Sequence, residues 1–365
     1  MFGGSVVVSV TGLSPRRSMR AATPLLAALS LAAALLALVK GWGGGTTTGL
    51  LLPSLAPFVK GLVLIMAIGA VALAGGLIDR RYEEAVARGA TGFDPIRVVR
   101  GEFFAFLMLS VCGAMLIPAS PDLIWLFLAL ELTSLPTYIM VAMSRGTRRA
   151  QEAAVKYFFL GALSTAILVY GFALLYGSTG SLQLSEIRGS LAAQAAIGGI
   201  DSVGTIGLLF VAIGLCFKLA AAPMHFYAPD VYEGAAAPVT GFLSFMPKMA
   251  GFAALLLVLD AAGWGGSGAP GNGLPPALQA TIWMVAVLTM TLGNAGALLQ
   301  RSAKRMLSYS SIAHSGYMLM AVVAGPELGL PALLFYLLAY GVTNNAVFGA
   351  IAGVERNGQE VEKIE

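Results

Sequence analysis

Charged residues are scarce in this chain of 365 residues: only 11% are Asp, Glu, Lys or Arg, whereas 58% are apolar. A water-soluble domain carries about 25% charged residues, and no soluble core could bury this much apolar surface. The mean hydropathy of +0.82 agrees. The shortage of charge excludes a soluble globular protein and predicts an all-α polytopic membrane protein surrounded by the lipid bilayer.

Cysteines and nucleotide-binding motifs are also scarce or absent. The two cysteines, Cys112 and Cys216, lie far apart in apolar runs, which argues against a metal or iron–sulfur framework and favours buried free thiols. No Walker loop, C-x-x-C pair or glycine fingerprint after a strand occurs. We therefore expect no cofactor in this chain, and any redox or nucleotide chemistry coupled to it must occur in a partner.

Apolar runs long enough to cross a bilayer, roughly 20 residues each, recur ten times. Their alanine, leucine, glycine and phenylalanine content predicts helices, and the signal is too strong per segment for a β-barrel. Glycine- and proline-rich connections such as 263–276 are expected to be loops. The predicted spans are 21–39, 59–78, 101–118, 121–143, 153–176, 203–223, 238–260, 279–299, 306–324 and 331–353.

Lysines and arginines are distributed unevenly between the two ends of these predicted spans. If ten spans alternate, sixteen of the 22 fall at one end, and only Lys40, Lys60 and Arg188 fall at the other. Cytoplasmic loops are enriched in basic residues, so both termini are predicted to be cytoplasmic. The same split explains the net charge of +4 without a nucleic-acid partner. The sixteen are Arg16, Arg17, Arg20, Arg80, Arg81, Arg88, Arg97, Arg100, Arg145, Arg148, Arg149, Arg301, Lys304, Arg305, Arg356 and Lys363.

The first run has a second interpretation, because Arg16 and Arg17 before it resemble the start of a secretory or twin-arginine signal. The run is long for a signal, and no clear small-residue cleavage site follows it, so we favour a retained first span. Residues 1–13 are too short to cross a bilayer, and we assign them no role.

Four ionisable residues lie inside otherwise apolar stretches: Glu131, Lys156, Lys218 and Lys248. Such residues are costly at bilayer depth and are functional-site candidates by default. Glu131 lies near the middle of its run, and Pro136 one turn later frees a backbone carbonyl close to it. The alternative for this glutamate is a static ion pair between helices.

Lys218 lies one turn before Pro223, which predicts a helix break, and helix breaks at membrane depth line cavities in transporters. Burial favours a neutral lysine and a carboxylate favours a charged one. Moving Glu131 and Lys218 together would therefore hold a proton, and separating them would release it. The alternative is that the Lys218 ammonium reaches the interface, about one turn away.

The remaining titratable candidates differ in depth. Lys248 lies at the centre of its run, too deep to reach either surface, whereas Lys156 lies close to a basic loop and can equally be an interface anchor. His225 and His314 are the only histidines, and imidazole titrates near neutral pH, so either could relay protons. A histidine hydrogen-bonded to a neighbouring hydroxyl is the alternative for both.

One long motif carries a family resemblance. Segment 217–240, FKLAAAPMHFYAPDVYEGAAAPVT, closely resembles subunit N of the proton-pumping NADH:quinone oxidoreductase, respiratory complex I. The block PDVYEG is typical of N subunits, and the sister L and M subunits and Mrp-type antiporters carry other residues there. Further matching segments are ELTSLP (131–136), EAAVKYF (152–158) and KRMLSYSSIAHSGY (304–317).

The resemblance implies an antiporter-like fold with two inverted five-helix repeats. The first would occupy 101–260 and a partial second 279–353, preceded by a cytoplasmic segment 1–20 and by helices with a basic loop at 21–100. A cytoplasmic segment 354–365 would follow. Family members have about fourteen spans, so the chain is expected to lack the first and the last three, including a second broken helix with its lysine.

The resemblance also assigns roles to the candidate residues. It implies that Glu131 and Lys218 form the ion pair of a half-channel and that Lys248 is the central relay. It makes Lys156 and His225 auxiliary groups; His314 is an auxiliary candidate from the sequence alone.

The implied activity is proton translocation driven by electron transfer from NADH to quinone in partner subunits. Those membrane and peripheral partners would hold the NADH, flavin, iron–sulfur clusters and quinone, and the expected location is the cell inner membrane. Three alternatives stay open: an Mrp-type cation/proton antiporter, a membrane subunit of a related hydrogenase- or formate-linked complex, and a degenerate fragment with a purely structural role.

Overall fold

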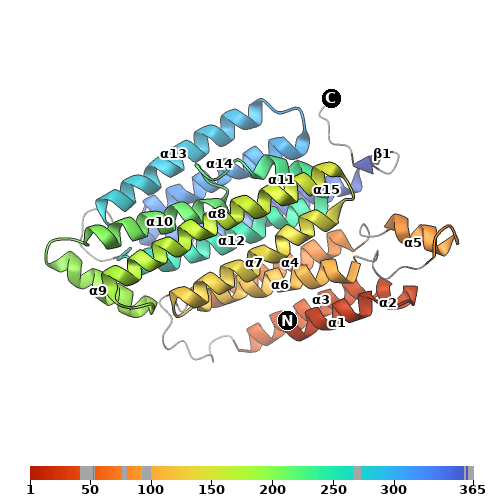
Figure 1. The fold of residues 1–365 in the computed structure, drawn as a ribbon, viewed down its shortest axis with the longest axis horizontal. Coiled ribbons are helices and arrows are strands. Elements are labelled where there is room, and N and C mark those ends of the chain that lie inside the picture. Colours follow the sequence, from red (N-terminus) through yellow and green to blue (C-terminus); the bar gives the residue numbers. More distant parts are fainter. Residues whose placement is uncertain are drawn as a thin grey trace.

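The computed structural model describes residues 1–41, 52, 54–75, 80–92, 100–265, 273–356 and 359–360. Arg97 and Lys363 lie outside these residues, as do parts of the predicted loop 263–276 and of the segment 354–365. The described chain is almost entirely helical (Figure 1). Its elements are α1 (Phe2–Gly12), α2 (Arg17–Ala21), α3 (Thr23–Lys40), α4 (Leu55–Ala74), α5 (Arg80–Ala87), α6 (Arg100–Leu116), the 3₁₀ turn η2 (Ile117–Ala119), α7 (Leu123–Ser144), α8 (Arg148–Thr179), α9 (Leu184–Ala196), α10 (Ser202–Leu219), α11 (Ala228–Gly234), α12 (Ala237–Ala261), α13 (Pro276–Leu298), α14 (Ala303–Val323), α15 (Pro326–Gly353), β1 (Glu355–Arg356) and β2 (Gln359–Glu360).

Nine helices among the described residues are long and apolar enough to cross a membrane. They correspond to nine of the ten predicted spans. The remaining one, 306–324, forms the 21-residue helix α14 but is not among the nine. Its serines, tyrosines and histidine lower its hydropathy, and it packs between α13 and α15. The fold is therefore the predicted all-α polytopic bundle, with one helix more polar than a typical span. The division into two repeats remains a prediction.

Side chains cap several of the long helices where the sequence turns polar. The Asp122 carboxylate accepts a hydrogen bond from the Trp125 N–H at 2.7 Å and begins α7. Thr147 and Asp201 cap α8 and α10 in the same way. Such caps satisfy N–H groups that the first helical turn leaves without a partner. They also extend α8 beyond the predicted run at 153–176, so that Lys156 lies in its third turn.

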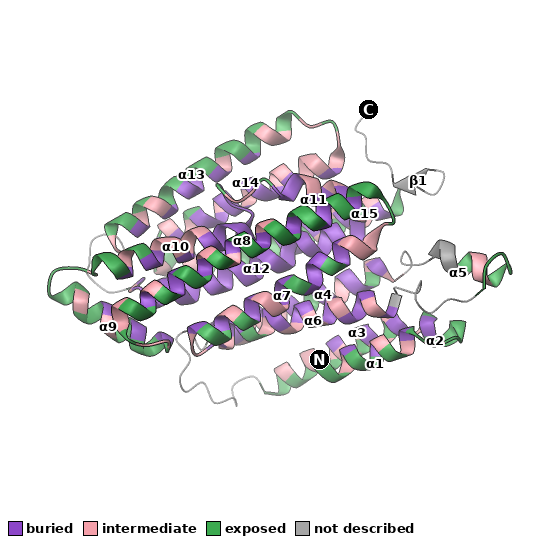
Figure 2. Cartoon of the chain, in the orientation of Figure 1, coloured by how far each residue is buried: buried purple, intermediate pink, exposed green. Residues whose placement is uncertain are grey.

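Helix α12 lies at the centre of the bundle, and all of its 25 residues are buried. It packs against α4, α7, α10 and α15. Figure 2 shows α12 buried along its length, whereas α8 and α13 present exposed residues outward. The exposed residues are mainly apolar, as expected for a surface that faces lipid. A charge on α12 is therefore enclosed by protein on every side.

The two ends of the bundle differ in charge. The arginine-containing helices α2 and α5 and the C-terminal β1 lie at one end, and α9 lies at the other (Figure 1). Residues 1–13, to which the sequence assigned no role, include α1, an 11-residue helix packed along α6. Gly12 and Gly101 allow this close approach, because a Cβ atom on Gly12 would lie 2.3 Å from the Gly101 Cα.

Candidate functional site

Glu131 and Lys218 meet between α7 and α10. The Lys218 Nζ lies 3.4 Å from the Glu131 Oε1 and donates a hydrogen bond of 2.5 Å to the Ser134 hydroxyl. Thr165, on α8, donates to the same Glu131 oxygen at 2.8 Å. The lysine side chain is 3% exposed and the glutamate 19% exposed. The two residues form a nearly buried ion pair in which the carboxylate also has a neutral hydrogen-bond partner.

The helix break follows Lys218 directly. Helix α10 ends at Leu219, and Ala220 adopts the left-handed conformation with φ of 53°. This conformation is unfavourable for a residue with a Cβ atom, so surrounding contacts must maintain it. The chain then runs through Pro223 before α11 begins.

Side chains from other elements satisfy the backbone groups that the break exposes. The Thr289 hydroxyl on α13 accepts a hydrogen bond of 2.9 Å from the Ala222 N–H. Tyr227 donates to the Phe217 carbonyl at 2.8 Å. Irregular backbone at membrane depth is tolerated where protein surrounds it, and this break meets that condition.

Lys248, on α12, is 2% exposed and points toward α14. Its Nζ donates to the Ser311 carbonyl oxygen and, at 2.6 Å, to the Ser315 hydroxyl. It also lies 5.2 Å from the centre of the Tyr340 ring. The Ser315 hydroxyl in turn donates to the Leu219 carbonyl at the end of α10. Ser315 thus connects Lys248 to the helix break that follows Lys218.

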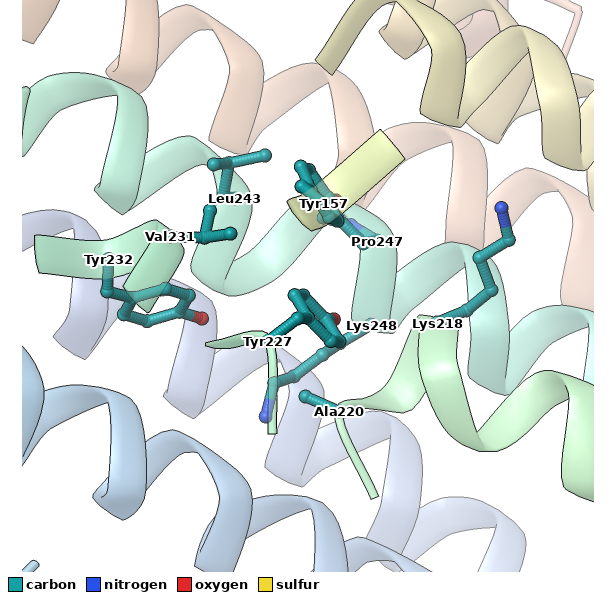
Figure 3. Close-up of a pocket in the computed structure, with 9 residues that line it drawn as sticks. All are labelled: Tyr157, Lys218, Ala220, Tyr227, Val231, Tyr232, Leu243, Pro247 and Lys248. Atoms are coloured by element: carbon teal, nitrogen blue, oxygen red, sulfur yellow. The ribbon is translucent and has the colours of Figure 1, made fainter. Parts of the chain in front are cut away.

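A small cavity separates the two lysines, and we call it the Lys218–Lys248 cavity. Its volume, counted as the space open to the centre of a water-sized sphere, is about 10 Å³. This is roughly the minimum needed to hold one water molecule. The two lysine side chains extend from it in opposite directions (Figure 3). The residues that line it are Tyr157, Lys218, Ala220, Tyr227, Val231, Tyr232, Leu243, Pro247 and Lys248.

Aromatic rings form much of the cavity wall. Tyr157 and Tyr227 stack with ring centres 5.2 Å apart, and Phe217 and Tyr227 lie 4.3 Å apart. Tyrosine combines a large apolar surface with a hydroxyl that needs a partner when buried. Such a wall excludes bulk water and leaves polar atoms at a few fixed points.

Lys156 lies in a different environment from the other two lysines. Its side chain is 44% exposed, and its Nζ lies 2.8 Å from carboxylate oxygens of both Glu152 and Asp230. Arg305 binds Asp230 at 2.9 Å and Glu233 at 3.0 Å. These residues, with Arg149 at 3.9 Å from Glu233, form a surface network that we call the α11 ion-pair cluster.

The cluster ties α11 to α8 and α14 through the Asp230 carboxylate. Burial by itself would raise the pKa of Asp230, but the hydrogen bonds from Lys156 and Arg305 outweigh burial and lower that pKa below its usual range. Asp230 therefore stays charged at neutral pH. Lys156 binds Glu152 and Asp230, and neither of these carboxylates lines the Lys218–Lys248 cavity.

The two histidines have different surroundings. His225 follows the helix break, is partly buried, and its Nδ1 has no hydrogen-bond partner in the described part of the chain. His314, on α14, shares a hydrogen bond of 2.5 Å with the Tyr336 hydroxyl, and its ring lies 5.1 Å from that of Tyr340. His314 is therefore linked to Lys248 through Tyr340, and the described residues show no such link for His225.

Lys304 is a buried lysine that the sequence placed in a basic loop. It lies in the first turn of α14, is 0% exposed, and its Nζ donates to the Ala235 carbonyl at 2.7 Å. Its position in the predicted loop, two residues before the run 306–324, gave no sign of burial, because the carbonyl that it binds lies 69 residues away in sequence. The search for charged residues inside apolar runs therefore selected the exposed Lys156 and missed the buried Lys304.

The sequence also missed the hydroxyl groups that surround the charged residues. Ser134 lies three residues after Glu131, and Ser311 and Ser315 lie four apart, spacings that place both members of each pair on one helix face. That spacing is a usable signal once the neighbouring charge is suspected. Thr165 lies on a different helix from Glu131, and nothing in the local sequence indicates that contact.

Comparisons with known proteins identify the family to which the chain is similar. The family model described as NADH:quinone oxidoreductase/Mrp antiporter, TM, matches residues 120–365. NADH-quinone oxidoreductase subunit N of Mycobacterium bovis is 44% identical over 291 residues, which cover 79% of this chain and 50% of the relative. The subunit N of Beutenbergia cavernae is 36% identical over 392 residues, covering 99% and 70%. The chain spans about half the length of the mycobacterial relatives that it matches.

Solved structures extend the likeness to three dimensions. A chain of respiratory complex I from Thermus thermophilus is 31% identical and has a TM-score of 0.69, with 96% of this chain and 69% of that chain covered. A chain of the Mrp complex from Dietzia is 20% identical with a TM-score of 0.71, covering 96% and 62%, and so shares the fold. On the family model and the subunit N relatives, the chain belongs to the NADH:quinone oxidoreductase/Mrp antiporter family of membrane subunits.

Proposed function

We propose that this chain is a proton-translocating, non-redox membrane subunit of an NADH:quinone oxidoreductase. The observation that carries the proposal is the buried contact of 3.4 Å between Glu131 and Lys218 at the end of a broken helix. Lys248 lies across the same cavity, on the most enclosed helix of the bundle. The N subunits among the relatives favour this function over that of an Mrp-type antiporter.

The geometry supports a simple cycle at Lys218. While Glu131 lies close, its carboxylate favours the ammonium form of the lysine, against the effect of burial. Thr165 competes for the same carboxylate oxygen, so a small shift of Glu131 toward α8 leaves Lys218 with only the Ser134 hydroxyl. A buried ammonium without a carboxylate favours losing its proton. The proton then passes through the Lys218–Lys248 cavity, which has room for about one water.

The energy scale of this pair matches the work of translocation. At 3.4 Å and an effective dielectric constant of about 20, the attraction between the two charges is about 5 kcal/mol. Moving one elementary charge across a membrane against 100 mV takes about 2.3 kcal/mol. The free energy of separating this ion pair is therefore large enough to drive one proton across the membrane. It is also small enough for a conformational change to reverse it.

The chemistry of electron transfer belongs to other subunits in this proposal. Partner membrane and peripheral subunits bind NADH, flavin, iron–sulfur clusters and quinone, and this chain carries no redox centre. The end of the bundle that holds α2, α5 and β1 lies on the cytoplasmic side of the inner membrane in this proposal. Cysteines placed near Lys40 and near Arg88, and probed from outside with a membrane-impermeant maleimide, test this orientation: only the first is expected to react.

Replacing Lys218 or Lys248 by alanine in the assembled complex tests the relay. In inverted membrane vesicles, NADH-driven proton uptake is expected to fall roughly tenfold or more relative to the wild type, because neither lysine has a nearby substitute. Proton uptake is measured by quenching of a pH-sensitive dye and divided by the rate of NADH oxidation. Lys40→Ala is the matched control, because Lys40 is an exposed lysine at a helix end.

The outcomes separate the alternatives. Normal proton uptake in both the Lys218→Ala and Lys248→Ala complexes would exclude the relay. Sodium-dependent proton exchange without NADH, in vesicles that lack the peripheral redox subunits, would instead favour the Mrp-type antiporter. Assembly is checked by the amount of this subunit that co-purifies with its partners.

A further inference from the structure

Lys248 donates its hydrogen bonds to α14, a helix that contains no aspartate or glutamate. In the part of the chain that the structure describes, no ion pair involves Lys248; its partners are the Ser311 carbonyl, the Ser315 hydroxyl and the Tyr340 ring. Lys218, by contrast, has Glu131. The two hydrogen-bond acceptors of Lys248 both lie on α14, so the position of α14 affects the charge on this lysine.

The Ser311 hydroxyl connects α14 to two of its neighbours, α11 and α15. It accepts a hydrogen bond of 2.7 Å from the Tyr340 hydroxyl on α15 and lies 3.1 Å from the Tyr232 hydroxyl on α11. All three side chains are buried. Tyr232 also lines the Lys218–Lys248 cavity. One serine thus binds the cavity wall on one side and the α15 aromatic residues on the other, while its own carbonyl holds the Lys248 ammonium.

We propose that Ser311 is a positioning residue that couples α11 and α15 to Lys248; the proposal rests on the relay function above. When Tyr232 and Tyr340 are both bound, α14 presents the Ser311 carbonyl and the Ser315 hydroxyl to the lysine. When α11 shifts, the bond to Tyr232 moves α14, and Lys248 loses hydrogen-bond acceptors that stabilise its ammonium form. Ser315 adds a third attachment, because it also binds the end of α10.

Alanine at Ser311 tests this coupling, and α14 offers a matched control. Ser308 lies one turn earlier, is equally buried, and its hydroxyl has no hydrogen-bond partner in the described part of the chain. Ser311→Ala is expected to lower proton uptake per NADH oxidised by roughly three- to tenfold, the range expected from losing one or two buried hydrogen bonds. Ser308→Ala is expected to leave that ratio unchanged. Ser311→Thr, which restores the hydroxyl, is expected to recover most of the loss.

Tyr340→Phe and the double variant Ser311→Ala/Tyr340→Phe complete the test. Tyr340→Phe removes a single oxygen atom, so it remains informative if Ser311→Ala fails to assemble. The double variant is expected to be no worse than Ser311→Ala, because both changes remove the same bond. Equal proton uptake in Ser311→Ala and Ser308→Ala, or full additivity in the double variant, would overturn the positioning role. Lys248→Ala is measured in parallel: if it pumps normally the relay itself is wrong, and if it does not, only the role of Ser311 is at stake.

Discussion

The α11 ion-pair cluster and the Lys218–Lys248 cavity lie on two faces of the same seven-residue helix, and they treat their lysines differently. In the cluster, Lys156 is 44% exposed and binds two carboxylates at 2.8 Å. In the cavity, Lys218 is 3% exposed and has one carboxylate at 3.4 Å. Exposed pairs are screened by water and contribute little, whereas a buried charge depends strongly on its one partner. Only the second arrangement makes protonation sensitive to a small movement.

Helix α11 connects these two regions. Asp230 and Glu233 point to the cluster, and Tyr232, between them in sequence, lines the cavity together with Tyr227, which precedes the helix. Residues three apart share a helix face, so the acidic face and the aromatic face follow from the sequence DVYE itself. The cluster therefore anchors the element that forms the cavity wall, and its contribution to function is indirect.

Removing the carboxylate of the buried pair should have the largest effect. Glu131→Gln keeps the shape of the side chain but leaves Lys218 without a counterion, and breaking a buried pair costs about 3–5 kcal/mol if the charge remains. Proton uptake per NADH oxidised is expected to fall roughly tenfold or more. The measurement uses inverted vesicles with equal amounts of assembled complex.

Glu152→Gln is the matched control for that change, because Glu152 also binds a lysine but is 60% exposed. It is expected to retain proton uptake within about a factor of two, as a surface pair contributes little. Equal uptake in the Glu131→Gln and Glu152→Gln complexes would mean that burial does not distinguish the two pairs.

Replacing Lys304 tests how much a buried lysine outside the cavity contributes to the stability of the fold. Lys304→Ala removes a fully buried side chain and the hydrogen-bond donor to the Ala235 carbonyl. Ala235 lies in the connection between α11 and α12. We expect a loss of about 2–4 kcal/mol, from the cavity left by the stem and from the lost hydrogen bond. Thermal denaturation of the purified complex in detergent measures it. Lys304→Met restores the volume but not the donor, so a melting temperature equal to the wild type would assign the whole effect to packing.

The sequence predicted the helical framework well because long apolar runs have few alternatives in a bilayer. The predicted span 238–260 became α12 at Ala237–Ala261, and 121–143 became α7 at Leu123–Ser144. Helix ends depended on local polar residues: Thr147 caps α8, which begins at Arg148, five residues before the predicted apolar run. The break after Lys218 was also visible, from Pro223 one turn later. Local composition was sufficient for all of these.

The direction of each lysine side chain was not predictable from the sequence, because it depends on contacts distant along the chain. Lys156 lies inside the predicted run 153–176 and Lys304 lies in the basic loop before the run 306–324, yet Lys156 is exposed and Lys304 is buried. The carboxylate that binds Lys156 on α11 is 74 residues away, and the carbonyl that binds Lys304 is 69 residues away. Hydropathy records how apolar a segment is, but not which face of it meets a neighbouring helix.

Replacing Lys156 should have the smallest effect. Lys156→Ala removes one cation from the α11 ion-pair cluster, and exposed pairs of this kind contribute about 0–1 kcal/mol. Asp230 keeps Arg305 at 2.9 Å, so α11 stays attached to α14. Proton uptake per NADH oxidised is therefore expected to stay within about a factor of two of the wild type, and melting should change little. A tenfold loss of uptake in a normally assembled Lys156→Ala complex would instead place this lysine in the proton path. The buried and exposed regions would then have to exchange protons through α8 or α11, because both helices contribute residues to both regions.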